Sequence, residues 1–380
     1  MGCFCFGSFP ASEKDPHQQG YSSGKNINLF SYDELRAATR NFHESSKIGR
    51  GGFGTVYKGT LKNRTEVAVK TLSAESKQGI QEFLTEIDTI TNVKHPNLVE
   101  LIGCCVQGSN RVLVYEYLEY NSLDRLLLGS KGKKADLDWS RRSAICMGAA
   151  RGLAFLHEEL DPPIVHRDIK ASNILLDRDF VPKIGDFGLA KLFPDNVTHL
   201  STRVAGTVGY LAPEYAMRGQ LTKKADIYSF GVLMLEIVSG RSSAKSTWSG
   251  TQKFLLELTW ELYEEGRLLE MVDSDLEQYP EEEVLRYMKI ALFCTQSSAK
   301  RRPSMAQVVS MLSKRANLNE KLLTPPGIIH DVMQINRGSK PTNASRSETA
   351  TSSMDPNSSA IDSTERPTSS PVSFTDMSPR

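Results

Sequence analysis

The chain has 380 residues, of which 39% are hydrophobic and 24% charged, a composition typical of globular proteins with a sizeable core. Lysine and arginine total 46 and aspartate and glutamate 45, so the net charge of +1 argues against a nucleic-acid partner. No apolar run approaches the roughly 18 residues of a membrane span, and no secretory signal is expected. Six cysteines make no disulfide framework, which favours a reducing cytosolic compartment.

The first predicted elements are a flexible N-terminal segment and a short helix. Residues 1–29 show no hydrophobic periodicity. The sequence S-x-x-E at 31–34 is a capping box, in which the hydroxyl and the carboxylate can each satisfy a free amide. It predicts a helical prelude over residues 30–41, with its helix from Tyr32 to Asn41.

A small β-rich lobe is expected next, over about residues 42–115. Val67 and Val69 alternate with less apolar neighbours, which is the period of two that a strand shows. One helix interrupts these strands, because apolar side chains recur there at helical spacing, at Ile80, Phe83, Leu84, Ile87 and Ile90.

A larger helical lobe is expected over about residues 119–316, followed by a disordered tail over 317–380. Of the last 40 residues, 17 are serine or threonine. Because too few apolar side chains remain to form a core, the tail is expected to stay disordered. A β-rich lobe followed by a helical lobe is the α+β arrangement of a two-lobed enzyme. Apolar stripes in the helical lobe predict helices at 143–157, 225–239, 253–265 and 281–295.

A glycine-rich motif, G-x-G-x-x-G-x-V, occupies residues 49–56. On its own it fits either a phosphate-binding loop or a glycine-rich hairpin without a ligand. A dinucleotide-binding turn needs a helix after the third glycine, whereas the sequence after Gly54 is strand-like. The motif therefore favours a flexible hairpin that covers phosphates.

Lys70 ends the strand-like sequence V-A-V-K, fourteen residues after Val56. Its ammonium group can pair with the phosphates of a nucleotide; the alternative is a lysine that only covers surface. Glu86 follows sixteen residues later and borders the buried stripe of the expected helix. A carboxylate at that position can hold Lys70 in place.

Three further motifs follow in a fixed order, H-R-D at 166–168, D-F-G at 186–188 and A-P-E at 212–214. Together with the glycine motif and Lys70, this order and spacing of motifs is very improbable by chance. The chain resembles the eukaryotic protein-kinase family over about residues 42–312. The resemblance implies the two-lobed protein kinase fold, and we expect the kinase domain to span residues 42–316.

The resemblance also implies the chemistry of phosphoryl transfer from ATP, which depends on positioning and charge stabilisation. Asp168 matches the catalytic base, and Lys170 matches a residue that stabilises the transferred phosphoryl group. Asn173 and Asp186 match the ligands of Mg²⁺. The expected ATP-binding residues besides Lys70 are Ile48, Gly49, Arg50, Gly51, Gly52, Phe53, Gly54, Thr55, Val56, Ala68, Glu116, Leu118 and Leu175.

Further matches concern the frame around this site. By resemblance, Tyr115 is the gatekeeper beside the adenine, and Asp226 braces the catalytic loop. Glu214 is expected to pair with Arg301 inside the large lobe, a buried ion pair whose disruption from one side would be costly.

The kinase class follows from smaller motifs. Lysine at position 170 and G-T-V-G-Y at 206–210 resemble serine/threonine kinases, so we expect protein substrates with Ser or Thr acceptors. The prelude and S-T-R-V-A-G-T at 201–207 resemble plant receptor-like kinases and their animal relatives, the interleukin-receptor-associated kinases. The sequences H-E-E at 157–159 and V-S-G-R at 238–241 are similar to the cold-responsive protein kinase group. With no ectodomain in the sequence, we expect a receptor-like cytoplasmic kinase downstream of a membrane receptor kinase; the alternatives are a pseudokinase and a membrane-anchored scaffold.

Arg167 precedes the expected base, and such an arginine is expected to be an unpaired positive group that receives a phosphate on the activation segment. The alternative for Thr207 is a structural hydroxyl that bridges Asp168 and Lys170. The candidate phosphorylation sites are Thr202, placed first, and Ser201, Thr207 and Thr198.

The extreme N-terminus, M-G-C-F-C-F, resembles an acylation signal. Gly2 is the expected myristoylation site, although Phe6 stands where the motif has Ser or Thr. Cys3 and Cys5 are the expected palmitoylation sites. Because one acyl chain binds membranes only marginally, we expect peripheral attachment to the cytoplasmic face of the plasma membrane through two. The alternative is a cytosolic tail.

Overall fold

The computed structural model describes most of the chain between residues 27 and 327, and all of these residues belong to one compact unit. The expected flexible ends lie largely outside the described residues, so the domain boundaries stay predictions. The described ranges are 27–51, 54–72, 77–91, 93–129, 137–194, 197–243, 246–248 and 251–327.

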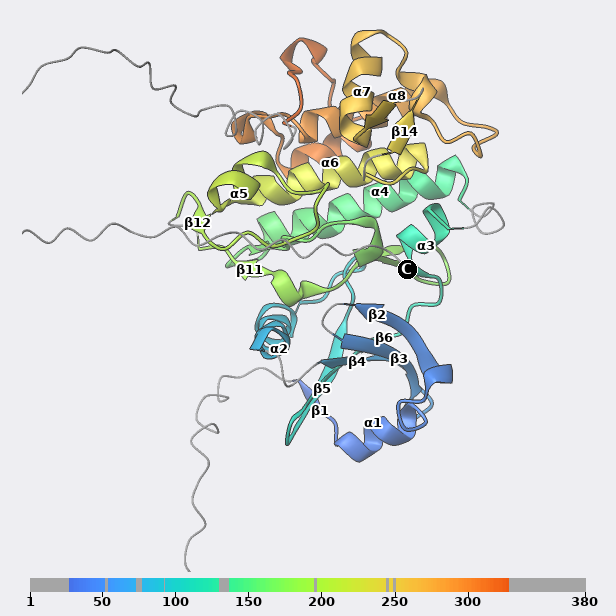
Figure 1. The fold of residues 1–380 in the computed structure, drawn as a ribbon, viewed down its shortest axis with the longest axis vertical. Coiled ribbons are helices and arrows are strands. Elements are labelled where there is room, and N and C mark those ends of the chain that lie inside the picture. Colours follow the sequence, from blue (N-terminus) through green and yellow to red (C-terminus); the bar gives the residue numbers. More distant parts are fainter. Residues whose placement is uncertain are drawn as a thin grey trace, which may run out of the picture. The chain divides into compact units, whose positions relative to one another are not determined.

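A six-stranded sheet forms the first lobe (Figure 1). Its order is β1-β5-β6-β4-β3-β2, and only the pairing of β1 with β5 is parallel. The expected strand around Lys70 is therefore a central one, flanked on both sides. The strands are β1 (Asn28–Leu29), β2 (Lys47–Gly51), β3 (Gly54–Thr60), β4 (Glu66–Leu72), β5 (Leu101–Gln107) and β6 (Asn110–Glu116).

The prelude covers one face of this sheet through helix α1 (Tyr32–Ala38). Ser31 caps it as expected, since its Oγ accepts a hydrogen bond from the amide of Glu34. Leu35 is fully buried in a cluster with Leu61, Val67, Val69, Cys105, Val112 and Val114. The helix ends three residues earlier than predicted, because the backbone turns left-handed from Arg40 onward. The prelude is thus part of the small lobe's core.

Helix α2 (Lys77–Ile90) packs beside the sheet and also contacts the D-F-G segment. Phe83, Ile87 and Ile90 are buried as the helical spacing predicted. Ile80, predicted in the same stripe, is 38% exposed. The buried apolar stripe of α2 therefore begins at Phe83 rather than at Ile80.

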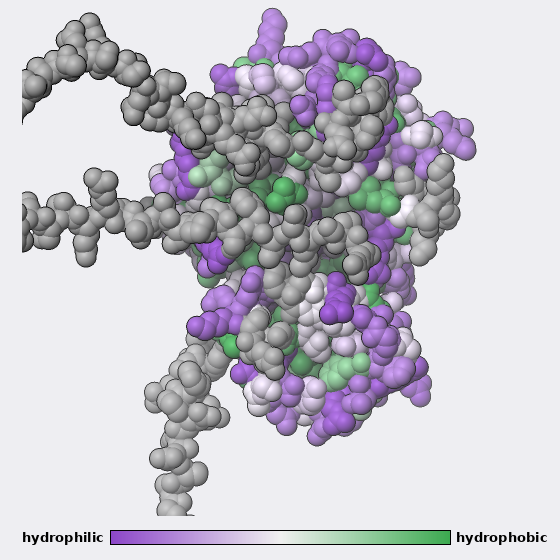
Figure 2. Space-filling view, in the orientation of Figure 1, coloured by the Kyte–Doolittle hydropathy of each residue, from purple (hydrophilic) through white to green (hydrophobic). Residues whose placement is uncertain are grey.

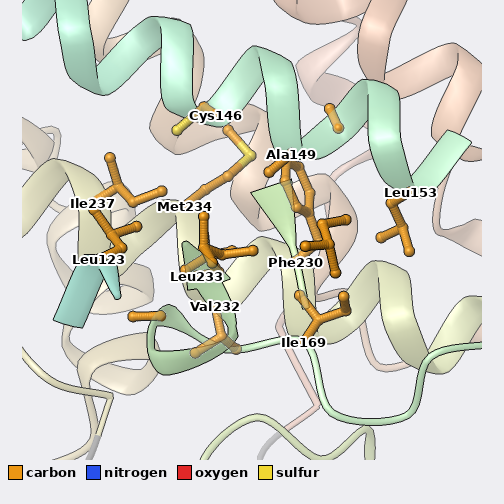
Figure 3. Packing of buried hydrophobic residues seen from close by; sticks show 14 of the residues in the cluster. Leu123, Cys146, Ala149, Leu153, Ile169, Phe230, Val232, Leu233, Met234 and Ile237 are labelled. Atoms are coloured by element: carbon orange, nitrogen blue, oxygen red, sulfur yellow. The ribbon is translucent and has the colours of Figure 1, made fainter. Parts of the chain in front are cut away.

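Helices build the second lobe around α4 (Trp139–Ala154) and α6 (Lys223–Ser239). Nearly every residue of α6 is buried, and Figure 3 shows its side chains interleaved with those of α4. α4 continues into a π-helical turn at Phe155–Glu159. The other helices are α3 (Leu123–Leu127), α5 (Pro213–Arg218), α7 (Leu255–Glu264), α8 (Glu281–Cys294) and α9 (Met305–Leu312).

Short strands connect the helices and loops of the large lobe. β7 (Asn121–Ser122), β9 (Ile174–Leu176) and β10 (Pro182–Ile184) form one small sheet in the order β10-β9-β7. The remaining strands pair in twos: β8 (Ile164–Val165) with β11 (Lys191–Leu192), β12 (Leu200–Ser201) with β13 (Gln220–Leu221), and β14 (Ser246–Trp248) with β15 (Thr251–Lys253).

On the face shown in Figure 2, the coloured surface is mostly hydrophilic, with scattered hydrophobic patches. Within the described ranges, no helix combines the length and the apolar character that a membrane span requires.

The predicted ion pair of Glu214 exists, but its partner is Arg302 and the prediction of Arg301 is wrong. Arg302 makes two parallel hydrogen bonds, Nη1 to Oε1 at 2.7 Å and Nη2 to Oε2 at 2.8 Å. The 3₁₀ helix Ala299–Arg301 ends before Arg302, whose extended backbone turns its side chain inward over the ring of Tyr228. Arg301 is exposed.

We predict that Arg302→Ala lowers the free energy of unfolding by about 3 kcal/mol, near the lower end for a broken buried pair because Glu214 keeps 20% exposure. Arg301→Ala is the matched control and should change it by less than about 0.5 kcal/mol. Chemical denaturation of both variants measures the difference. Equal effects would contradict the assignment.

Candidate active site

The predicted lysine–glutamate pair is present, and a third residue extends it. Nζ of Lys70 in β4 lies 2.6 Å from Oε1 of Glu86 in α2. The same Nζ lies 2.8 Å from Oδ1 of Asp186, the aspartate of the D-F-G motif. One ammonium group therefore joins the sheet, α2 and the large lobe.

Charge and burial fix the protonation of this group of residues. Burial alone would lower the pKa of Lys70, but the carboxylates of Asp186 and Glu86 outweigh burial and raise it. Partial desolvation opposes ionisation of Asp186, whose side chain is 42% exposed, yet the Lys70 ammonium holds the pKa of that carboxyl below its ordinary value. The hydroxyl of Tyr115 donates to Oε2 of Glu86, and burial together with this carboxylate raises the pKa of Tyr115. Lys70 thus stays charged and Tyr115 stays protonated at neutral pH.

Asp168, the expected base, is surrounded by polar groups from the same loop and from the activation segment. Nζ of Lys170 lies 2.8 Å from its Oδ2, and Nδ2 of Asn173 donates to the same oxygen at 3.1 Å. Oδ1 accepts from the hydroxyl of Thr207 at 2.8 Å, and Lys170 also donates to that hydroxyl at 2.8 Å. Thr207 therefore makes the bridge that was considered as its structural alternative.

Asp226 lies under the catalytic loop, where the resemblance had assigned it. Its carboxylate accepts from the amides of His166 at 2.7 Å and Arg167 at 2.8 Å. His157, in the π-helical turn, lies 2.9 Å away through Nε2. Burial opposes the charge, but His157 and the loop hold the pKa of Asp226 below its ordinary value. Sequence reasoning gave His157 no role here, since it is one more residue of a buried helix.

The D-F-G segment has a defined orientation. Asp186 has a left-handed backbone, with φ of 62°, and the following Phe187 is buried. The Phe187 ring packs edge-on against His166 at 4.9 Å between ring centroids, and His166 bonds the carbonyl of Gly185 through Nε2. The H-R-D and D-F-G motifs thus pack against and hydrogen-bond each other, and Asp186 points toward Lys70.

The residues expected around ATP come from both lobes, on β2, β3, β4 and β9, at the end of β6 and in the segment after it. Gly54 has a packing role, because a Cβ there would lie 2.0 Å from the carbonyl oxygen of Thr71. The side chain of Glu116 makes hydrogen bonds of its own, because Oε1 accepts from the amide of Glu100 and from Nζ of Lys183. Gly52 and Phe53 lie outside the described residues.

Comparison with known proteins agrees with this arrangement. The family model for protein tyrosine and serine/threonine kinases matches residues 42–312. The chain belongs to the protein kinase family. It is 56% identical over 313 residues to cold-responsive protein kinase 1 of Arabidopsis thaliana, covering 82% of this chain and 80% of that protein.

Two receptor-like relatives extend this comparison. Two probable leucine-rich-repeat receptor-like serine/threonine-protein kinases of the same plant are 54% and 53% identical over 302 and 303 residues. The chain spans only 29% of the length of each. The predicted two-lobed kinase fold and plant receptor-like kinase class are confirmed, and nothing supports the pseudokinase alternative.

Arg167 of this kinase differs from the expectation of an unpaired charge. Its guanidinium donates to the hydroxyl of Tyr215 at 2.7 Å and to the carbonyls of Leu189 at 3.1 Å and Arg203 at 3.0 Å. These acceptors are neutral, so the positive charge is hydrogen-bonded but not neutralised by them. Of the candidate phosphorylation sites, Thr198 and Ser201 are exposed and Thr202 is partly buried.

The donor set fits magnesium. The amide nitrogen of Asn173 bonds Asp168, which leaves the amide oxygen as its metal-binding atom, and Asp186 binds Lys70 through one oxygen only. The described residues contain no cluster of three or more acidic, histidine or cysteine side chains that would hold a metal alone. Mg²⁺ suits such a site because it takes other ligands from water and phosphate.

Glu82 is a part of this site that sequence reasoning missed. It lies one turn before Glu86, is 2% exposed, and packs against Gly188 of the D-F-G motif. Its Oε2 has no hydrogen-bond partner among the described residues. Burial raises the pKa of Glu82 to about 8. The Lys70 ammonium opposes this rise, whereas the carboxylates of Asp186 and Glu86 add to it. From sequence alone it reads as one of many helix carboxylates.

We predict that the stability of this kinase falls as pH rises toward about 8 because of Glu82. The ordinary pKa is 4.5, so between 4.5 and about 8 the unfolded chain releases a proton that the folded chain keeps. The loss should be about 1.4 kcal/mol per pH unit and level off above 8.

Glu82→Gln keeps the shape without the ionisation and is the matched variant. Chemical denaturation at pH 6, 7 and 8 should show that the free energy of unfolding of the variant, relative to that of the wild type, increases as pH rises. Parallel pH curves would refute the role of Glu82.

Proposed function

We propose that this kinase transfers the γ-phosphoryl group of ATP to serine and threonine hydroxyls of proteins, in receptor-linked signalling of a plant cell. The observation that carries the proposal is the assembled set of Lys70 on Glu86 and Asp186, with Asp168 held by Lys170 and Asn173. A binding-only protein would have no need for this arrangement of charges.

Each side chain has a defined task in this proposal. Asp168 aligns the substrate hydroxyl and accepts its proton, and Thr207 and Asn173 hold the carboxylate in that orientation. Lys70 binds the nucleotide phosphates, while Lys170 lies beside the base, where negative charge develops on the transferred group. Asn173 and Asp186 would hold Mg²⁺, which would neutralise part of the phosphate charge.

We predict that Asp168→Asn lowers the phosphorylation rate of a generic Ser/Thr protein substrate by about 10²- to 10⁴-fold, since the base is lost. Lys70→Met should abolish activity as well. Both variants should keep the fold, which thermal unfolding checks. Activity above a tenth of wild type in either variant would refute the proposed roles, and phosphate on tyrosine alone would refute the acceptor class.

We propose that phosphorylation of Thr202 activates the kinase. The Thr202 hydroxyl and Nη2 of Arg167 both donate to the carbonyl of Arg203, at 3.5 Å and 3.0 Å, so a phosphate on Thr202 would lie near an uncompensated guanidinium. Charge-assisted hydrogen bonds of that kind are among the strongest in proteins.

We predict that phosphatase treatment or Thr202→Val lowers the rate about tenfold, whereas Ser201→Ala, an exposed neighbour, leaves it unchanged. A substrate assay with phosphosite mapping by mass spectrometry measures this. An unchanged rate after complete removal of phosphate from Thr202 would exclude the mechanism.

We propose that the kinase is attached to the cytoplasmic face of the plasma membrane by acyl chains on Gly2 and on Cys3 or Cys5. These residues lie outside the described part of the chain, and the proposal rests on their resemblance to acylation signals. A single myristoyl chain binds only marginally, so a palmitoylated cysteine is needed for stable attachment.

We predict that the wild type fractionates with membranes and that the Cys3→Ser/Cys5→Ser variant becomes mostly soluble, with an unchanged kinase rate in vitro. Gly2→Ala should have the same effect if Phe6 is tolerated by the acylating enzyme. Fractionation and palmitate labelling provide the measurement. A soluble wild type, or a membrane-bound double variant, would show that the attachment has another basis.

A further inference from the structure

A side chain of the large lobe reaches the glycine-rich hairpin next to the expected adenine site. Nδ2 of Asn121, in β7, donates a hydrogen bond to the carbonyl oxygen of Ile48, in β2, at 3.2 Å. Asn121 follows the segment that connects the lobes, and Ile48 begins the hairpin that is expected to cover the phosphates. The bond therefore links the two sides of the nucleotide site.

The carbonyl of Ile48 is available because β2 is irregular at this residue. In the register of β2 with β3, Lys47 faces Tyr57 and Gly49 faces Val56, so Ile48 has no opposite residue. A bulge of this kind disrupts the ladder locally and redirects the groups of the extra residue. The irregularity directs a small-lobe acceptor toward the large lobe.

Asn121 is held rigidly by its own surroundings. Its backbone pairs with Leu176 of β9, and its φ of 62° is left-handed, a conformation that asparagine tolerates better than most residues. Its Oδ1 accepts from the amide of Ser122 at 2.9 Å. The two hydrogen bonds fix which end of the amide faces Ile48, since a reversed amide would lose both.

The connection between the lobes is also fixed on its other side. Oε1 of Glu116, at the end of β6, accepts from Nζ of Lys183 in β10 at 2.9 Å and from the amide of Glu100 at 2.8 Å. The connecting segment is thus tied to the large lobe at Glu116, and the Asn121–Ile48 bond ties the base of the hairpin to it a few residues further on.

We propose that Asn121 is a positioning residue that closes the base of the glycine-rich hairpin over the bound nucleotide and slows nucleotide release. The proposal rests on the proposed function, because it assumes that the adenine lies between Ile48 and Leu175. Asn121 acts through Ile48 and has no part in the proton or phosphoryl transfer.

The test measures nucleotide exchange separately from chemistry. Asn121→Asp keeps the acceptor for Ser122 and tolerates the left-handed backbone, but it presents a carboxylate to the Ile48 carbonyl. We expect KM for ATP and the dissociation rate of a fluorescent ADP, followed by stopped flow, to rise about three- to tenfold, as for the loss of one hydrogen bond. The single-turnover rate at saturating ATP should stay within about twofold of wild type.

Two further variants make the result decisive. Asn121→Gly keeps the backbone conformation and removes the side chain, so it should match Asn121→Asp in ADP release even if the carboxylate disturbs folding. Asn63→Asp makes the same chemical change at an exposed turn between β3 and β4, where Oδ1 accepts from the amide of Thr65, and should leave ADP release unchanged.

The possible results separate the two proposals. Wild-type ADP release in both Asn121 variants would overturn the inference while leaving the kinase function intact. A fall in the single-turnover rate with unchanged ADP release would also overturn it, because Asn121 would then act in the chemical step. A wild type that binds no ADP would overturn the proposed function together with the inference.

Discussion

The arrangement of the active site depends on one buried ammonium group. Lys70 is shared between Glu86 and Asp186, and these three side chains come from β4, α2 and the segment after β10. Removal of Lys70 would leave the fully buried carboxylate of Glu86 without its positive partner, which is far more costly than the loss of a surface pair. The position of α2 against the sheet and the direction of the D-F-G motif are therefore coupled through Lys70.

A second buried charge supports the other half of the site. Asp226, in the almost entirely buried helix α6, holds two successive amides of the catalytic loop. Because α6 packs against α4 and α8, the loop is anchored to the packed core of the large lobe. The small lobe thus positions the nucleotide-binding lysine, and the large lobe independently positions the base.

Sequence reasoning succeeded where a residue's role depends on its motif and failed where it depends on the local course of the backbone. The pairing of Lys70 with Glu86 could be predicted because helical spacing put Glu86 at the edge of a buried stripe. Arg301 and Arg302 are chemically identical neighbours, and only the end of a 3₁₀ helix decides which one faces Glu214. The end of α1 depends likewise on a left-handed turn that the capping box does not predict.

The same limit applies to residues whose importance is set by their neighbours in space. Glu82 becomes unusual only because α2 places it against Gly188, and Asn121 only because a bulge turns the Ile48 carbonyl toward it. Asn121, Arg167 and Asp186 all have left-handed backbones, and each directs a group to another lobe or another loop. Such conformations cost free energy and persist where the surroundings enforce them. At these three positions the left-handed backbone directs a side chain to another segment, while the charge of Lys70 joins the two lobes and the charge of Asp226 holds the catalytic loop within the large lobe.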